Sequence, residues 1–101
     1  MIHHIVMWKL KDFAEGRTKE ENIELLIQGY EELKKHIPQI QNAYIKRNIE
    51  PKEGNFDTIL FTKFENKEEM ESYLSHPEHK KYSALCKKLR EDRASVDFEE
   101  W

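Results

Sequence analysis

The alternation of hydrophobic and polar residues predicts four β-strands. They cover residues 2–10, 40–49, 56–64 and 94–99. A polar loop over residues 11–17 follows the first strand, and a short linker with Pro51 and Gly54 joins the second and third strands into a hairpin. Both faces of the first strand are largely apolar, so a layer is expected over each face. Helices of the same chain account for one layer, and a second copy of the protein accounts for the other.

Apolar residues at helical spacing predict one long helix and one bent helical region. The long helix begins after Thr18, which has capping-box spacing to Glu21, and it ends before Pro38. In the second region Asn66 has the same spacing to Glu69 and caps a helix that starts one residue later. Pro77 ends that helix and is favourable in the first turn of a new one, so the chain is expected to bend there.

The resulting order, β-α-β-β-α-β, is the ferredoxin-like α+β arrangement with an antiparallel sheet. Residues 1–101 are long enough for one domain with a modest core. Four apolar residues are expected on the sheet face without helices: Ile5, Met7, Ile59 and Phe61. Two such faces pressed together predict a homodimer that closes into a dimeric α/β barrel. Met7→Glu or Phe61→Glu should give monomeric or insoluble protein, because a buried unpaired charge is strongly unfavourable.

Composition narrows the class of protein and its partners. The formal net charge is −3, which argues against a nucleic-acid partner, since such proteins carry a basic patch. The sequence has no apolar run of membrane-spanning length, and its first residues do not form a signal peptide, so no membrane partner is expected. Cys86 is the only cysteine. It excludes a disulfide scaffold or cysteine zinc site and favours a cytoplasmic location.

The segment from Tyr73 to His79 holds the candidate chemistry. His79 falls in the first turn of the helix that begins at Pro77, where the positive end of the helix dipole disfavours an imidazolium ion. A histidine that is neutral at working pH can act as a general base. The Tyr73 hydroxyl is expected to reach an imidazole nitrogen of His79 or to share a bound oxygen with it. In the alternative interpretation, His76 caps the helix and His79 lies on a solvated face.

The remaining histidines do not predict a metal centre. His3 and His4 are adjacent strand residues that point to opposite faces, so they do not form a chelating pair. His4 is interpreted as a core histidine bound by a backbone carbonyl or by Tyr73. His76 and His79 have helical spacing, but the proline between them places His76 at the cap, and we predict no metal.

Along nearly its whole length the chain resembles the stress-responsive dimeric α/β-barrel (Dabb) family. The resemblance rests on residues 4–12, on the Ile37-Pro38 pair and on residues 73–79. Within the family the chain is similar to the olivetolic acid cyclase-like proteins, which close a linear polyketide by an intramolecular aldol condensation without a metal. The resemblance implies that His79 is the general base and that Tyr73 assists it.

The expected substrate-binding residues lie on two strands and one helix. His4 and Trp8 share one strand face, Thr58 and Leu60 share another, and Tyr30 lies on the apolar stripe of the long helix. If these faces meet, they enclose an apolar cleft with a few polar groups, as in a small-ligand site. The olivetolic acid cyclase-like proteins have a histidine at the position of Thr58 and a small aliphatic residue at that of Trp8, so the resemblance does not imply the same substrate.

Three functions fit these features. The first is a cofactor-free cyclase or lyase that acts on a small carbonyl compound with His79 as base. The second is a non-catalytic dimeric module that binds a small, stress-related ligand. The third is a haem-degrading or quinone-forming monooxygenase of a related barrel fold, with His4 and His79 as the available axial ligands. No feature of the sequence requires a cofactor, so none is predicted.

Overall fold

A computed structural model describes residues 1–50 and 52–100 of the chain. The predicted turn residue Pro51 lies outside the described residues, as does Trp101. Among the described residues, no helix is both long enough and apolar enough to cross a membrane.

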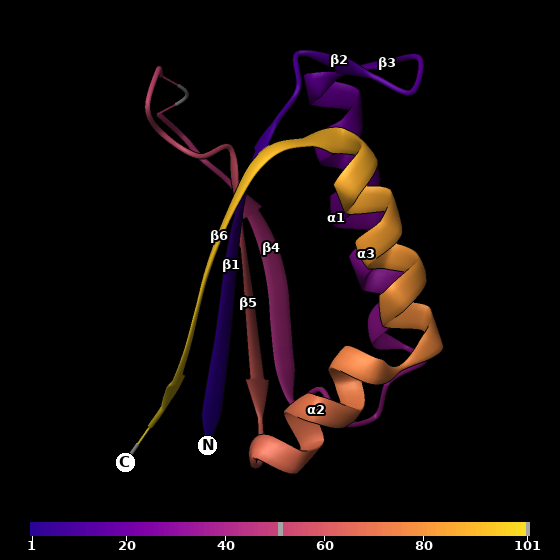
Figure 1. Ribbon diagram of the computed structural model, residues 1–101, viewed down its shortest axis with the longest axis vertical. Helices are drawn as coiled ribbons and strands as arrows, with labels where there is room; N and C mark the ends of the chain where they lie inside the picture. Colours follow the sequence, from indigo (N-terminus) through magenta and orange to yellow (C-terminus); the bar gives the residue numbers. More distant parts are fainter. Residues whose placement is uncertain (51, 101) are drawn as a thin grey trace.

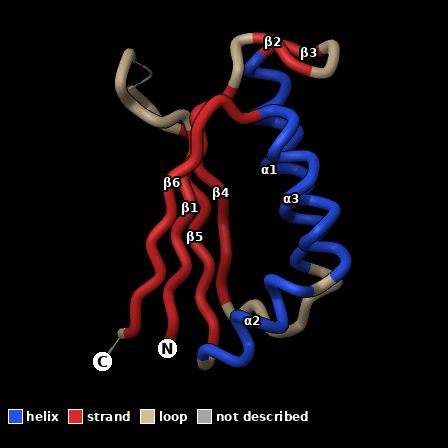
Figure 2. Tube along the Cα trace, viewed as in Figure 1, coloured by secondary structure: helices blue, strands red, loops and turns tan. Residues whose placement is uncertain are grey.

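A four-stranded antiparallel sheet forms one layer of the molecule, and three helices form the other (Figure 1). The strands lie in the order β4-β5-β1-β6, with bounds β1 Ile2–Leu10, β4 Asn42–Arg47, β5 Thr58–Phe64 and β6 Arg90–Glu99. The helices are α1 Lys19–Lys34, α2 Lys67–Ser75 and α3 Pro77–Leu89, and all three lie on one side of the sheet (Figure 2). This arrangement confirms the predicted ferredoxin-like α+β fold.

The element boundaries differ from the predicted ones in five places, of which one is that β5 begins at Thr58 and not at residue 56. The loop after β1 contains a small hairpin of β2 Phe13–Ala14 and β3 Arg17–Thr18, which turns at Gly16 with φ of 77°. α1 ends at Lys34, before Pro38, although the capping box at its start is formed as predicted. β4 is shorter at both ends than residues 40–49. β6 begins directly after α3 and not at residue 94, because the chain passes from helix to strand without a loop.

The core lies between the helices and the sheet. Its largest fully buried side chains include Tyr30, Tyr73 and Phe64. α1 and α3 approach closely at Gly29, where an added Cβ would lie 3.2 Å from Cε1 of Tyr82. The Tyr82 hydroxyl also donates a hydrogen bond of 2.6 Å to the Leu26 carbonyl. The missing side chain at Gly29 therefore makes room for the ring that joins the two helices.

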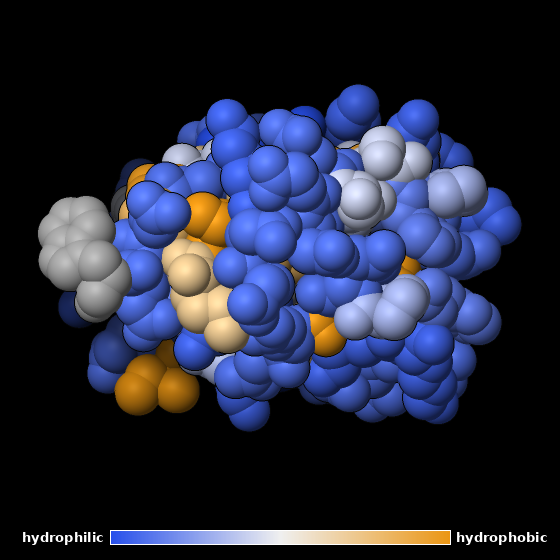
Figure 3. Space-filling view, turned by 90° about the horizontal axis from the view of Figure 1, so that it is seen from below, coloured by the Kyte–Doolittle hydropathy of each residue, from blue (hydrophilic) through white to orange (hydrophobic). Residues whose placement is uncertain are grey.

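The sheet face without helices carries an apolar patch, which we call the open face. Its large hydrophobic residues are Ile5, Met7, Tyr44, Ile59, Phe61, Val96 and Phe98. Val96 is 60% exposed and Phe98 45%, so this face is less covered than the opposite one. In the view from below, hydrophobic groups are concentrated toward the sheet side and the helix side is mostly hydrophilic (Figure 3). An unpartnered apolar surface of this kind is typical of an interaction site.

Candidate functional site

The bend between α2 and α3 is built by two caps and a proline. The Asn66 side chain accepts a hydrogen bond from the Glu69 backbone N–H, which starts α2. His76 is extended, with ψ of 134°, and its Nδ1 accepts a hydrogen bond of 3.1 Å from the Glu78 backbone N–H. Pro77 occupies the first position of α3, where a missing N–H costs nothing. The predicted capping role of His76 is therefore confirmed.

Tyr73 is fully buried and anchors this bend to the rest of the core. Its hydroxyl lies 2.8 Å from the Tyr30 hydroxyl, which in turn lies 3.0 Å from Oγ1 of Thr62. Burial raises the pKa values of both tyrosines, so both phenols are protonated at neutral pH. The three hydroxyls satisfy one another in a place where an unpartnered polar group would be unfavourable.

His79 lies against the ring of Tyr73 and does not bond to its hydroxyl. The two ring centroids are 4.4 Å apart, and among the described residues the Tyr73 hydroxyl bonds to Tyr30. His79 Nδ1 donates a hydrogen bond of 3.2 Å to the Leu74 carbonyl. The expected hydrogen bond from tyrosine to imidazole is thus not formed, because the tyrosine hydroxyl extends beyond the ring contact toward α1.

The environment of His79 makes it a neutral imidazole with a defined free nitrogen. Burial lowers its pKa below the usual 6.5, the hydrogen bond to the Leu74 carbonyl opposes this shift, and the nearby charges of His4 and Arg93 add to the lowering. A neutral ring that donates through Nδ1 carries its lone pair on Nε2. At pH 7, Nε2 is therefore able to accept a proton.

His4 is held by a carboxylate. The sequence analysis predicted a backbone carbonyl or Tyr73 as its partner, and this prediction was wrong. Its Nδ1 is hydrogen-bonded to the Asp97 carboxylate, the residue opposite it in the β1/β6 ladder. The ring of His4 still contacts that of Tyr73, edge to face, with centroids 6.1 Å apart. Since the carboxylate can only accept, His4 donates through Nδ1 and also keeps Nε2 free when it is neutral.

These rings enclose a small internal cavity of about 50 Å³, called the inner cavity below. It is lined by His4, Val6, Trp8, Leu60, Tyr73, Leu74, His79, Tyr82, Ser83, Cys86, Arg90 and Arg93. It has room for one or two groups the size of a water molecule, each of which occupies roughly 30 Å³. An outer groove of about 240 Å³ lies beside it and shares Leu74, His79 and Ser83 as its boundary. His79 therefore lies at the boundary between the groove and the cavity.

The structure brings together most of the predicted site residues. His4, Trp8, Leu60, Tyr73 and His79 all line the inner cavity. Tyr30 reaches it only through the hydroxyl of Tyr73. Thr58 is buried but lines a separate depression of about 430 Å³ near the β4–β5 loop. The threonine that bonds to the tyrosines is Thr62, which is two residues further along the same strand face.

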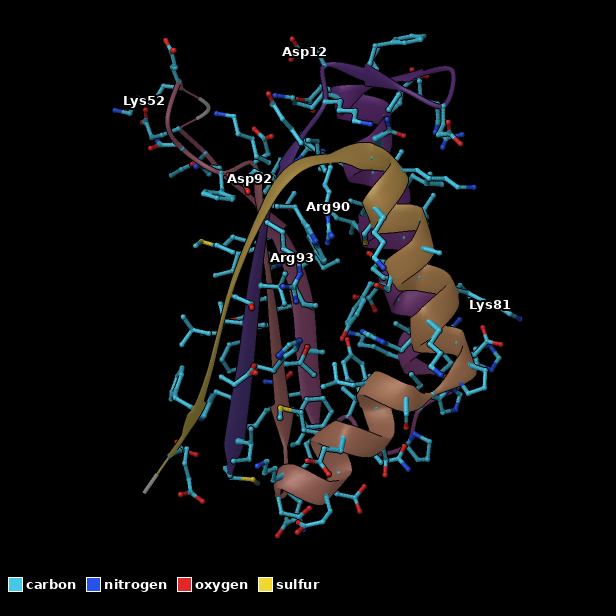
Figure 4. All side chains as sticks on the ribbon, viewed as in Figure 1. Asp12, Lys52, Lys81, Arg90, Asp92 and Arg93 are labelled. Atoms are coloured by element: carbon cyan, nitrogen blue, oxygen red, sulfur yellow. The ribbon has the colours of Figure 1, made fainter. Side chains whose placement is uncertain are left out.

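Sequence reasoning missed the polar residues of β6. Asp97 bonds to His4, and Arg90 and Arg93 line the inner cavity from the side of β6 that faces α3 (Figure 4). These residues could be found only from the register of the β1/β6 ladder, which places Asp97 opposite His4 and Arg93 opposite Trp8. The alternation of residues within β6 predicts the sheet face of each side chain but not its partner on β1.

Cys86 also lines the inner cavity but is not a nucleophile. Burial raises the pKa of its thiol to about 12, so the reactive thiolate is scarce at neutral pH. Within residues 1–50 and 52–100, no group of three or more His, Cys, Asp or Glu side chains is placed to hold a metal ion. The group of the cavity wall that is best suited to accept a proton is therefore the His79 imidazole.

Sequence comparisons place this fold in a known family and beside a plant relative. The model of the stress responsive A/B barrel domain, Dabb, matches residues 2–100. A stress-response A/B barrel domain-containing protein of Arabidopsis thaliana, DABB1, is 28% identical over 101 positions, which cover 97% of this chain and 46% of that protein. The chain thus spans about half the length of this curated relative.

Two solved structures illustrate the range of proteins with this fold. A dimeric protein with a ferredoxin-like fold from Bacteroides fragilis is 25% identical, with a TM-score of 0.76 over 98% of this chain and 95% of that one. A hydroxynitrile lyase from Passiflora edulis is 14% identical, with a TM-score of 0.81 over 96% of this chain and 90% of that one. The likeness to the lyase shows a shared fold alone.

Proposed function

Because the chain belongs to the stress responsive A/B barrel domain family, we propose that it acts as a homodimer on a small carbonyl compound. The proposed reaction needs no cofactor: a proton transfer to His79 allows a carbon–carbon bond to be made or broken, as in a cyclase or a lyase. The observation that carries the proposal is His79, an imidazole with a lowered pKa and a free Nε2 at the edge of the inner cavity. Such a group is suited to general-base catalysis near neutral pH.

The proposed chemistry begins with proton abstraction. Nε2 of His79 removes a proton from the carbon next to a carbonyl group, which leaves an enolate and an imidazolium ion. The enolate carbon attacks a second carbonyl of the same molecule, and the resulting alkoxide takes the proton back from the imidazolium. In the reverse direction the same groups cleave the bond, which is lyase chemistry. A plant protein of the same fold is a hydroxynitrile lyase, so the fold is compatible with lyase chemistry.

In this proposal Tyr73 positions His79 by ring contact, and its hydroxyl does not bind substrate. That hydroxyl is bonded to the Tyr30 hydroxyl and is buried in the core. His4, oriented by Asp97, is the second imidazole in the cavity wall. A protonated Nε2–H of His4 can donate a hydrogen bond to the enolate or alkoxide oxygen, so we assign His4 as the group that stabilises this oxygen.

Non-catalytic ligand binding is the second candidate, and the satisfied hydroxyl network favours it. A core in which Tyr30, Tyr73 and Thr62 bond only to one another needs no substrate to complete it.

The homodimer is proposed to form through the open face. A stacked pair of rings, Tyr44 on Phe61, presents an apolar surface there, and the Bacteroides fragilis relative is described as dimeric. Phe61→Glu should give monomer or insoluble protein in sedimentation experiments, while Glu68→Gln on α2 should leave the wild-type mass unchanged. A stable wild-type monomer at micromolar concentration would contradict this part of the proposal.

The lone buried thiol of Cys86 supports a reducing compartment, and we propose the cytoplasm.

The catalytic part is tested without knowledge of the natural substrate. The probes are 4-oxopentanoate and its neutral analogue 4-oxopentanamide, whose protons next to the ketone exchange slowly with D₂O. The wild-type protein should accelerate this exchange, measured by NMR, for at least one probe, and His79→Gln should return it to the buffer rate. Arg47→Gln, a change on the distant strand β4, should leave it unchanged. Exchange at the buffer rate with wild-type protein would contradict catalysis and favour the binding module.

A further inference from the structure

Two arginines of β6 line the inner cavity without an acidic partner. No salt bridge joins Arg90 or Arg93 to a carboxylate within residues 1–50 and 52–100, although other cations of the chain have such partners. Among the described residues, the Arg93 side chain forms its one hydrogen bond with the Ser95 hydroxyl, at 3.2 Å. Figure 4 shows both side chains directed from β6 toward the space in front of α3. The planar guanidinium group of an arginine can donate two parallel hydrogen bonds, so two arginines placed in this way are suited to bind a carboxylate or phosphate.

A third donor lies in the same cavity wall. Trp8 is opposite Arg93 in the β1/β6 ladder and is 4% exposed. Its indole N–H is buried and has no hydrogen-bond partner among the described residues. A buried donor without an acceptor is unfavourable unless a ligand or a water molecule supplies one.

The surroundings of the cavity favour an anion in a chain whose formal net charge is −3. The outer groove is lined by Lys80 and Lys87, and neither forms a salt bridge within the described part of the chain. Of the nearby acidic groups, Asp97 is bound to His4, Glu78 lies 3.4 Å from Lys81, and Asp92 accepts a hydrogen bond from the Arg93 backbone N–H. Within the described residues, no carboxylate is therefore paired with the side chain of either arginine.

We infer that the ligand of the inner cavity carries an oxyanion, a carboxylate or a phosphate, that is held by Arg90 and Arg93 with the indole N–H of Trp8. This inference rests on the proposed function, and it adds the class of compound: a carbonyl compound with an acidic group. The acidic group lies on the arginines, while the reacting carbonyl lies toward His79. A purely structural role is the alternative for Arg90, because it follows the last turn of α3 and a cation there is favoured by the helix dipole.

Binding is measured separately from reaction, with 4-oxopentanoate, 4-oxopentanamide and inorganic phosphate as probes. NMR signals of the arginine Nε–H groups and of the His79 ring report where each probe binds. The acid should bind at least about tenfold more tightly than the amide, as expected when a charged hydrogen bond is removed. Tighter binding of phosphate than of the acid would identify a phosphate ligand, and the reverse order would identify a carboxylate.

Variants assign the effect to the two arginines. Arg90→Gln and Arg93→Gln should each weaken binding of the acid by about tenfold or more, and leave the amide unaffected. Arg93→Lys, which keeps the charge but loses the fork, should fall between glutamine and wild type. Arg47→Gln is the matched control, since Arg47 is held by Glu20 and Glu24 on the far edge of the sheet. Circular dichroism spectra establish that each variant is folded.

The outcomes separate this inference from the proposed function. Equal affinity for acid and amide, or acid binding unchanged in both glutamine variants, would overturn the anion site even if proton exchange were catalysed. Acid binding that depends on Arg90 and Arg93 without any catalysed exchange would support the anion site and refute the general base. An unfolded Arg90→Gln protein would assign Arg90 to structure, and Arg93→Gln would then decide the inference alone.

Discussion

The helix-covered face of the sheet differs between its two edges. At the β4 edge, Ala43 and Ile45 are almost completely buried beneath α1. At the β6 edge, the residues on the same face are Arg93, Ser95 and Asp97, and all three are exposed. One edge is thus part of the dry core, and the other is a polar border along which the inner cavity and the outer groove lie.

This difference shows how a small domain forms a site without an insertion. The helices cover β4, β5 and β1, so the edge strand β6 is free to carry charged side chains next to the core. Tyr73 lies at the boundary: its hydroxyl belongs to the buried network, and its ring contacts the two imidazoles of the cavity. Stability and chemistry should therefore respond to different substitutions.

The largest expected effect is on stability at the β4 side. Leu26→Ala in α1 removes a side chain with no exposed surface and should lower the free energy of unfolding by about 2–5 kcal/mol. Ser95→Ala at the β6 edge should change it by no more than about 0.5 kcal/mol. Urea denaturation of both variants measures the contrast. Equal losses would mean that the two edges do not differ in packing.

A smaller loss is expected when the hydroxyl network is broken. Tyr30→Phe leaves the hydroxyls of Tyr73 and Thr62 without their shared partner, which should cost about 1–3 kcal/mol of stability. Tyr44→Phe is the control, because the Tyr44 ring is 39% exposed and its hydroxyl has no hydrogen bond among the described residues. Thermal melting measures both. A loss for Tyr44→Phe as large as that for Tyr30→Phe would show that the network adds nothing.

The same contrast explains which features the sequence could predict. Elements with one buried face follow local rules: the caps at Thr18 and Asn66, the bend at Pro77 and the order of the elements were predicted correctly. The family was also predicted, and its match confirms it. These features depend on neighbours in sequence or on a repeating pattern, both of which are visible in one chain.

The polar details of the site depend on pairs that are distant in sequence. His4 and Asp97 meet only because β1 and β6 pair in one register, and a shift of one residue would separate them. Thr62 bonds to the tyrosine network, whereas the predicted site residue Thr58 lies outside the inner cavity, although both lie on the same strand face. Alternation predicts on which face of the sheet a side chain lies, whereas tertiary packing decides which position along the strand contacts the helices.

The smallest expected effect is a change in the pH dependence of stability. The pKa of His79 is lower in the folded protein than the 6.5 of an ordinary histidine, so the unfolded chain binds more protons between these two values. Wild-type stability should therefore be complete above pH 6.5 and fall as the pH drops through this window. His79→Gln removes this contribution, and its loss of stability toward acid should be smaller than that of the wild type in urea denaturation. A steeper loss in the variant would mean that the pKa is raised.

The central claim, that His79 is a neutral base with a free Nε2, is tested most directly by NMR of the imidazole nitrogens during a pH titration. We expect a His79 pKa below 6.5 and, at pH 7, a neutral ring with its proton on Nδ1, bonded to the Leu74 carbonyl. A His79 pKa at or above 6.5, or a proton on Nε2 in the neutral ring, would contradict the account.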